Sequence, residues 1–517
     1  MNTDGYAATP QAGGLPHETS GRGAGRAPEE RRRWAGVSPL WLVAAVFVIV
    51  QLMVVPLWMP LGWDEGVYVS QVGSRVPAAY FSAPRARGIS WLAAPAVLLS
   101  SSTVVLRAWM LALWTAGLVA AYWPWRRLVG EKVTAVAAAM FAGLWVVQFY
   151  AAEVMPNTYV AYGAVAATGW FLRAVSSHDR RAAVALALGI AFIALMRPAD
   201  AVFIAAVLTA GTVVVRSWRR WSAGLAVLTG LGVGLLPWLV EACARYGSPL
   251  ARLREGSDVQ GGMHLSAAFG MQLRALNGPL LCRPCRSSWS YPPLSGWWLA
   301  LPVLVAAGLA LAARRRRAEP VGFAGLALAT VCAAAVSVQY VLLLDYAAPR
   351  FLIPTYALLA LPVAVLVVSG VGAVSRRRRP VMAGALAVLF VMHLAGQVLV
   401  LDRRTNSQVR SRTALLDLAQ RLHQAGLRPP CTLVGSDVVP LAFHAGCRSE
   451  ALTGNNASIT RKELLRRTAL EPVAAAGNSR HTPRYARRWA RCSLMSADGT
   501  PWYVFIAPSP GVRPERC

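Results

Sequence analysis

The 517-residue chain has few acidic residues and almost no lysine. It contains 23 Asp or Glu against 52 Lys or Arg, and only Lys132 and Lys462 among the basic residues are lysines. Charged residues make up 15% of the sequence and hydrophobic residues 56%, and the hydrophobic residues gather in repeated apolar runs of about 20 residues. A soluble nucleic-acid-binding protein with a net charge of +29 would not carry such runs, so we expect no nucleic-acid partner. The excess of positive charge instead indicates the cytoplasmic loops of a membrane protein.

The N-terminal segment, residues 1–38, lacks apolar periodicity and is rich in Gly, Ala, Pro and Arg. This composition predicts a disordered tail. The basic run Arg31, Arg32 and Arg33 precedes the apolar run 39–59, which places the tail in the cytoplasm. The run is longer than the apolar part of a signal peptide and no small-residue cleavage site follows it, so we interpret it as a membrane helix.

Further basic clusters divide the rest of the apolar sequence and mark each return to the cytoplasm. They lie at residues 126–127, 180–181, 216–220, 314–317 and 376–379. Three stretches between clusters are too long for one span and carry isolated charges midway, at Glu153, Arg197 and Arg350, where we expect an outward-facing turn. The pattern predicts an α-helical polytopic protein of the plasma membrane, with about 11 transmembrane helices in residues 39–401 and a large first outer loop. An odd number of spans places residues 402–517 outside the cell.

The last segment, residues 402–517, is predicted to be a small extracytoplasmic α/β domain. Strands are expected at 431–435 and 502–507 and a helix at 462–470. Four cysteines, Cys431, Cys447, Cys492 and Cys517, fit an oxidising exterior and allow three pairings. We favour a disulfide between Cys431 and Cys447, because a strand, a helix and a turn would return the chain to its starting point.

The isolated charges beside the spans are the candidates for chemistry, because a charged residue in or near the bilayer costs free energy unless it serves a site or a partner. They share the outer side of the predicted topology: Asp64, Glu65, Glu153, Arg197, Asp200, Asp345 and Arg350. Carboxylates and arginines lining one outward-facing cavity would suit a divalent cation and an anionic phosphate. A transporter would more often carry such groups near the bilayer midplane in two matching halves, and we find no such internal repeat.

Three segments on this outer side resemble the C-type glycosyltransferases, a superfamily that includes the protein mannosyltransferases of family 39 and the aminoarabinose transferases. They are Trp63-Asp64-Glu65-Gly66 running through Tyr80-Phe81-Ser82-Ala83-Pro84 to Leu106-Arg107, the Arg197-Pro198 turn, and Asp345-Tyr346-Ala347-Ala348-Pro349-Arg350. The resemblance covers roughly residues 39–400, and within the superfamily the chain is most similar to actinobacterial membrane proteins.

The resemblance implies an enzyme that moves a sugar from a polyprenyl-phosphate-linked donor to an envelope glycan, lipid or protein acceptor outside the membrane. Asp64, with Glu65 beside it, matches the acidic position of the superfamily and would act as general base or hold a metal. Glu153 would be a second ligand for that metal, Mg²⁺ or Mn²⁺. Arg350, and after it Arg197, would bind the donor phosphate, because a guanidinium can hold two phosphate oxygens.

Each of these roles has a simpler structural alternative. Asp64 would cap a helix over residues 65–75, Glu153 would be a solvated turn residue, and Arg197 would only pair with Asp200. The whole chain has alternatives of the same kind: a lipid or polymer transporter, or a non-catalytic membrane anchor for the outer domain. Convergence of Asp64, Glu153 and Arg350 on one cavity would favour the enzyme.

Overall fold

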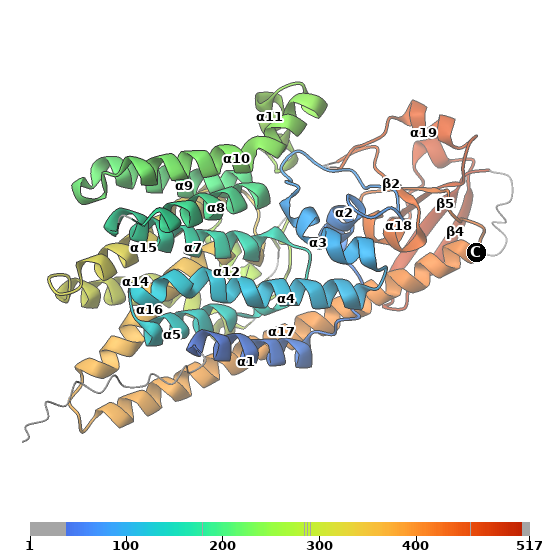
Figure 1. Ribbon diagram of the computed structural model, residues 1–517. Helices are drawn as coiled ribbons and strands as arrows, with labels where there is room; N and C mark the ends of the chain where they lie inside the picture. The colour runs from blue at the N-terminus through green and yellow to red at the C-terminus, as the bar shows by residue number, and fades with distance from the viewer. Residues whose placement is uncertain are drawn as a thin grey trace, which may run out of the picture. The chain divides into compact units, whose positions relative to one another are not determined.

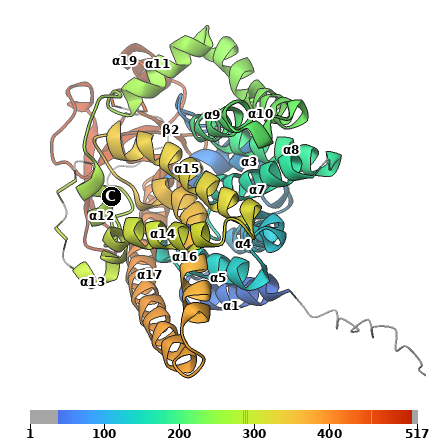
Figure 2. The ribbon, with the colours of Figure 1, turned by 90° about the vertical axis from the view of Figure 1, so that its left-hand side faces the viewer.

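The structure is a computed structural model that describes residues 38–177, 179–283, 285–286, 288–289, 291–454 and 456–508. The expected cytoplasmic tail, except for Ser38, and Cys517 lie outside the described residues. Figures 1 and 2 show the long apolar helices packed side by side and a β-sheet beyond one end of them.

Each range expected to span the membrane contains an α-helix. The helices are α1 (Pro39–Val54), α4 (Thr103–Tyr122), α5 (Glu131–Ala142) with α6 (Trp145–Phe149), α7 (Pro156–Ser176), α8 (Arg180–Met196), α9 (Pro198–Val214), α10 (Trp221–Tyr246), α14 (Trp297–Arg314), α15 (Pro320–Leu342), α16 (Ile353–Ala373) and α17 (Arg379–Gln424). Among the described residues, 6 helical segments are long and apolar enough to cross a membrane. The protein is therefore a multi-pass membrane protein, and the number of 11 spans stays a prediction.

Shorter elements connect these helices. They are the helices α2 (Trp63–Ser70), α3 (Gly88–Leu99), α11 (Pro249–Val259), α12 (Phe269–Ala275) and α13 (Pro292–Ser295), and the 3-10 turns η1 (Trp123–Arg127), η2 (Arg216–Trp218) and η3 (Pro349–Leu352). Three turns interrupt the helices where the isolated charges predicted them. Glu153 lies between α6 and α7, Arg197 separates α8 from α9, and Arg350 lies in η3 between α15 and α16.

The large first outer loop contains α2 and α3. α2 begins at Trp63, because the Gly62 amide N–H donates to the Glu65 carboxylate at 2.9 Å and so satisfies one of the free donors of the first turn. The helix ends at Ser70, five residues before the end that the helix-cap alternative assumed. This short helix fixes both acidic residues of the loop, Asp64 and Glu65, in its first turn.

The last apolar helix, α17, does not end where its apolar sequence ends. The sequence predicted a span to residue 401 and a separate domain from residue 402, whereas α17 continues without interruption to Gln424. Its second half is charged, yet Leu418, Ala419 and Leu422 on one face pack into the core of the C-terminal sheet. Figure 1 shows this helix running from the apolar bundle to the sheet.

The C-terminal segment is an α/β domain, as expected. Its elements are β1 (Thr432–Val434), α18 (Val439–Ala445), β2 (Arg448–Glu450), α19 (Arg461–Arg467), β3 (Val473–Gly477), η4 (Arg484–Ala486), β4 (Ala490–Met495) and β5 (Pro501–Ile506). The strand order is β2-β1-β3-β5-β4, with β1 parallel to β2 and to β3 and the remaining pairs antiparallel. Cys431 and Cys447 form a disulfide with Cα atoms 4.7 Å apart, joining the start of β1 to the residue before β2.

Candidate active site

A cavity of about 800 Å³ lies where one end of the helix bundle meets the α/β domain. Five of the seven charged residues predicted on the outer side line it, Asp64, Glu65, Glu153, Arg197 and Arg350, whereas Asp200 and Asp345 do not. The remaining lining comes from the first outer loop, from the turns that carry Glu153, Arg197 and Arg350, from the end of α11 and the segment 280–283, from α17 and from loops of the α/β domain. Residues that lie far apart in the sequence are thus brought to one chamber.

Asp64 lies between two guanidinium groups. Its Oδ1 accepts a hydrogen bond from Arg85 Nη2 at 2.6 Å, and its Oδ2 accepts one from Arg350 Nη2 at 3.1 Å. The side chain of Asp64 is 24% exposed, whereas those of Arg85 and Arg350 are 13% and 15% exposed. Since Gly62 is the N-cap residue of α2 and both Asp64 oxygens bind arginines, Asp64 does not cap the helix.

The charge around Asp64 keeps it ionised. Burial alone would raise the pKa of Asp64, but the positive charges of Arg85 and Arg350 outweigh burial and hold the pKa below its ordinary value. Arg85 is fixed in turn by Ser82, whose Oγ accepts from Arg85 Nε at 3.2 Å. Asp64 is therefore a carboxylate at neutral pH, accessible from the cavity and surrounded by more positive than negative charge.

The two predicted phosphate-binding arginines are held differently. Arg350 donates from Nη1 to the Leu280 carbonyl at 3.0 Å and from Nη2 to Asp64. Arg197 lies 3.5 Å from the buried Asp200 carboxylate, and its side chain remains 23% exposed toward the cavity. Arg197 also lies over the ring of Phe351, 5.7 Å from its centre. The pairing with Asp200 that the sequence suggested as an alternative is thus present together with a place in the cavity wall.

Glu65, the neighbour of Asp64, lies in a buried ion network. Arg107 donates to both of its oxygens, Nη1 to Oε1 and Nη2 to Oε2, at 2.9 Å each. The amide N–H of Val154 donates to Oε1 at 3.0 Å. The Glu65 side chain is 2% exposed and that of Arg107 1%. This bidentate pair ties α2 to α4 and to the turn that carries Glu153.

Arg412 of α17 connects Glu65 to Glu153. Its Nη1 lies 3.1 Å from Glu65 Oε2, and its Nη2 donates to Glu153 Oε1 at 2.8 Å. The side chains of Arg412 and Glu153 are 7% and 3% exposed. Arg107, Glu65, Arg412 and Glu153 form a network in which two positive and two negative charges balance, which we call the buried ion network.

The two carboxylates of this network differ in their tendency to hold a proton. Burial raises the pKa of Glu65, but Arg107 and Arg412 outweigh it and keep the pKa below its ordinary value. Burial raises the pKa of Glu153 to about 7, because its one strong partner, Arg412, is shared with Glu65 and the Glu65 charge adds repulsion. Glu153 is therefore the member of the network that is easiest to protonate.

The predicted divalent-metal site does not fit these contacts. Both oxygens of Asp64 accept from arginines, and Glu153 is bound to Arg412. Within the described ranges, no group of three or more His, Cys, Asp or Glu side chains could hold a metal ion. A cation at Asp64 would also meet the positive charges of Arg85 and Arg350. We therefore derive no step of the chemistry through a metal.

Sequence reasoning missed several residues of the cavity wall. Arg85 directly follows the segment Tyr80 to Pro84 on which the resemblance rests, and Arg412 lies beyond the predicted end of its helix. Tyr150 and Arg283 also line the cavity. Burial raises the pKa of Tyr150 to about 12, so its hydroxyl stays protonated and can donate a hydrogen bond. The position of Arg85 was a usable signal, whereas nothing in the sequence placed Arg412 beside Glu65.

No protein-family model and no curated protein sequence matches this chain. Solved structures do. ArnT from Cupriavidus metallidurans bound to undecaprenyl phosphate is 15% identical, and the match covers 91% of this chain and 98% of that chain with a TM-score of 0.63. The Archaeoglobus fulgidus oligosaccharyltransferase tethered to an acceptor peptide with the NVT sequon is 13% identical, with coverage of 90% and 74% and a TM-score of 0.51. The chain therefore shares its fold with these two proteins.

Proposed function

We propose that this membrane protein is a glycosyltransferase that moves a sugar from a polyprenyl-phosphate-linked donor to an acceptor on the outer face of the plasma membrane. One observation carries the proposal. An ionised, partly exposed carboxylate, Asp64, lies between two arginines in a cavity at the ends of apolar helices. The likeness to ArnT, whose structure contains undecaprenyl phosphate, supports the same class of lipid donor.

Arginines and a carboxylate have different roles in the proposed reaction. Arg350 and Arg197 line the cavity with guanidinium groups, which bind phosphate oxygens with charge-assisted hydrogen bonds. Asp64, between Arg85 and Arg350, accepts the proton of the acceptor hydroxyl. Glu65 was expected to act beside Asp64, but its oxygens are taken by Arg107, Arg412 and two backbone amides, so we assign it a positioning role.

The proposed transfer is a single displacement at the anomeric carbon of the donor sugar. The acceptor oxygen forms a bond to that carbon while its proton passes to an oxygen of Asp64. The bond between the anomeric carbon and the phosphate oxygen breaks, and its electron pair leaves on polyprenyl phosphate. The leaving group gains one negative charge in this step, and Arg350 and Arg197 stabilise it by forming stronger ion pairs.

The same arginines couple donor binding to the basicity of Asp64. In the free protein the positive charges of Arg85 and Arg350 keep the pKa of Asp64 low, which makes it a weak base. A donor phosphate bound at Arg350 adds a negative charge next to Asp64, and the pKa of Asp64 then rises toward the range in which a base works best at neutral pH. We accordingly expect Asp64 to become an effective base only when the donor is bound.

The proposal is tested in cells, because the acceptor is unknown. Lipid-linked sugars and envelope glycans are compared between a strain lacking this protein and strains that express it with Asp64→Asn or with Asp345→Asn. Asp345 is the matched control, since it is an exposed aspartate of the same outer side that does not line the cavity. We expect the deletion and Asp64→Asn to lose the same glycan and accumulate the same lipid-linked sugar, and Asp345→Asn to resemble the wild type.

Two outcomes would contradict the proposal. Unchanged glycans in the deletion strain would exclude an envelope glycosyltransferase under the growth conditions used. Full complementation by Asp64→Asn would show that the protein acts without this carboxylate, as a membrane anchor would.

A further inference from the structure

The α/β domain has a crevice at the carboxyl ends of β1 and β2. The chain leaves β1 through α18 to reach β2, and leaves β2 through α19 to reach β3 on the other side of β1. Leu441 of α18 packs with Leu433, whereas Leu464 of α19 packs with Val434 on the opposite face of β1. Ligands of open α/β sheets bind outside the carboxyl ends of the parallel strands.

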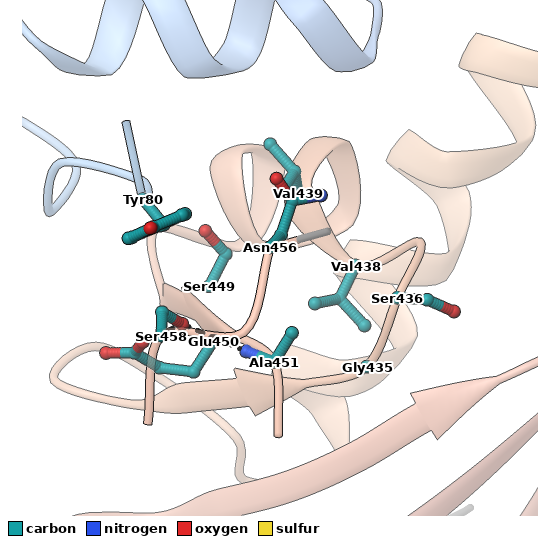
Figure 3. Close-up of a pocket in the computed structure, with 10 residues that line it drawn as sticks. All are labelled: Tyr80, Gly435, Ser436, Val438, Val439, Ser449, Glu450, Ala451, Asn456 and Ser458. Carbon is teal, nitrogen blue, oxygen red and sulfur yellow. Dashed lines mark hydrogen bonds between the residues drawn. The ribbon is translucent and has the colours of Figure 1, made fainter. Parts of the chain in front are cut away.

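A small pocket occupies this crevice. Figure 3 shows the loop after β1 and the loop after β2 on its sides, and Tyr80 from the first outer loop facing them. The volume of the pocket is about 10 Å³, enough for one water or one hydroxyl group. Any larger ligand must therefore keep most of its bulk outside the pocket.

One polar group in the pocket lacks a protein partner. Ser449, the middle residue of β2, is 7% exposed, and its hydroxyl has no hydrogen-bond partner among the described residues. The Asn456 side chain, which lines the same pocket, likewise has no partner within the described part of the chain. The Ser449 hydroxyl lines the pocket and can both donate and accept, so it is a site for a ligand group that does the same.

The pocket shares part of its lining with the large cavity. Ser436 and Asn456 line both, and Asp437 and Gly454 extend the same wall of the large cavity. In Figure 3 the side chain of Ser436 points away from Ser449, so the loop after β1 presents groups on two sides. This wall carries hydroxyl, amide and carboxylate groups and no arginine, in contrast to the wall around Asp64.

That chemistry suits a carbohydrate better than a peptide. Side-chain hydroxyls, amides and carboxylates are donors and acceptors that match sugar hydroxyls. A peptide would need an open strand edge or apolar side-chain pockets. β2 is only 3 residues long, and Ala451 just beyond it is already bonded to Ser458 through both its amide and its carbonyl.

We propose that the α/β domain binds the carbohydrate acceptor, with one sugar hydroxyl in the pocket at Ser449 and the sugar ring in the large cavity against Asp437 and Asn456. This inference rests on the proposed function for the identity of the ligand as an acceptor. The acceptor is either a polysaccharide or the head group of a glycolipid, because both present the same sugar hydroxyls.

The test is a binding experiment on the full-length protein in nanodiscs. Neutral trisaccharides of hexoses and of pentoses, each with and without an octyl chain, are titrated and followed by saturation-transfer NMR. Ser449→Ala removes the hydroxyl in the pocket and Asp437→Asn removes the charge on the wall. Ser493→Ala and Asp498→Asn are the matched controls, since these residues belong to the same domain and line neither cavity.

We expect at least one trisaccharide to bind the wild type and both controls, and to bind Ser449→Ala and Asp437→Asn about fivefold more weakly, the loss of roughly one hydrogen bond. Tighter binding of the octyl form would assign the glycolipid, and equal binding the polysaccharide. No binding by any trisaccharide, equal binding by all variants, or binding only of a serine- or threonine-containing peptide would overturn the inference.

Undecaprenyl phosphate separates this inference from the proposed function. It should raise the melting temperature of Ser449→Ala as much as that of the wild type, because no arginine among the described residues lines the pocket at Ser449. Loss of trisaccharide binding with this shift intact supports the acceptor site. If undecaprenyl phosphate does not raise the melting temperature of the wild type, the proposed lipid donor is contradicted. Trisaccharide binding then still supports or overturns the carbohydrate site by the criteria above.

Discussion

Asp64 and Glu65 are adjacent in the sequence and in the first turn of α2, yet they belong to two different charge clusters. Asp64 is 24% exposed and faces a cavity in which arginines outnumber carboxylates. Glu65 is 2% exposed and belongs to the buried ion network, where two arginines balance two glutamates. The difference teaches that charge balance, more than burial or distance, separates a ligand-binding cluster from a structural one. A network with equal positive and negative charge stabilises the fold by its own ion pairs, whereas a cluster with excess positive charge can bind a further anion.

The comparison predicts opposite phenotypes for two neighbouring substitutions. Asp64→Asn should lower the transfer rate by about 10² to 10⁴ and leave the melting temperature near that of the wild type, because it removes the base but keeps the shape. The rate is measured with membranes and the lipid-linked sugar that accumulates in the deletion strain. A variant that transfers at the wild-type rate would place Asp64 with the structural carboxylates and remove the contrast.

Glu65→Gln should destabilise the protein, because Arg107 and Arg412 would lose their shared negative charge in a buried setting. Removing one partner of a buried ion pair costs about 3–5 kcal/mol, and we expect a large fall in melting temperature and in the yield of folded protein. The matched control is Glu131→Gln, which breaks the pair of Glu131 with Arg126. That glutamate is 51% exposed, so its loss should cost about 0–1 kcal/mol. Equal stability of the two variants would contradict a structural role for the network.

Arg350→Lys should weaken binding of undecaprenyl phosphate about tenfold while leaving some transfer, because lysine keeps the charge but not the two-pronged geometry. Donor binding is measured by the rise in melting temperature with lipid concentration. Arg421→Lys serves as the control, since Arg421 is 47% exposed on α17 and pairs only locally with Asp417. Unchanged donor affinity in Arg350→Lys would exclude Arg350 as the phosphate ligand.

The smallest expected effect is a pH dependence of stability. The folded protein holds the Glu153 proton more tightly than the unfolded chain does, since the pKa is raised to about 7. This contribution to stability is complete below the ordinary pKa and is lost as the pH rises through about 7. Relative to Glu153→Gln, the wild type should therefore lose melting temperature between about pH 5 and about pH 8. Parallel curves for the two proteins would mean that Glu153 stays ionised throughout.

The fold was largely predictable because the bilayer imposes strong rules on sequence. Apolar runs and basic clusters located the helices, and isolated charges located the turns at Glu153, Arg197 and Arg350. The convergence of those turns on one cavity followed from their common side. The partners of each charge did not follow, because pairing such as that of Arg412 with Glu65 depends on three-dimensional packing between elements hundreds of residues apart.

The C-terminal domain was less predictable for a related reason. The strands predicted at 431–435 and 502–507 correspond to β1 and β5, whereas β2, β3 and β4 were not anticipated. β2 has only 3 residues, which give too little period-two pattern to be recognised. The end of α17 was missed because the prediction equated the end of an apolar run with the end of a helix. A helix can continue beyond its apolar run when the following residues pack against another element, as Leu418, Ala419 and Leu422 pack against the sheet.

The continuity of α17 makes helical phase a constraint on the whole protein. Leu401, Thr405, Arg412 and Ala419 are all buried and fall on one stripe of the helix, so a single rotational setting serves the apolar bundle, the buried ion network and the sheet. Inserting or deleting one residue after Leu401 would turn everything beyond it by about 100° and shift it by about 1.5 Å. Length changes should therefore be tolerated before α17 or after it, but not inside it. Even a step of about seven residues, which nearly restores the phase, would shift Arg412 along the helix axis by about 10 Å and away from Glu65 and Glu153.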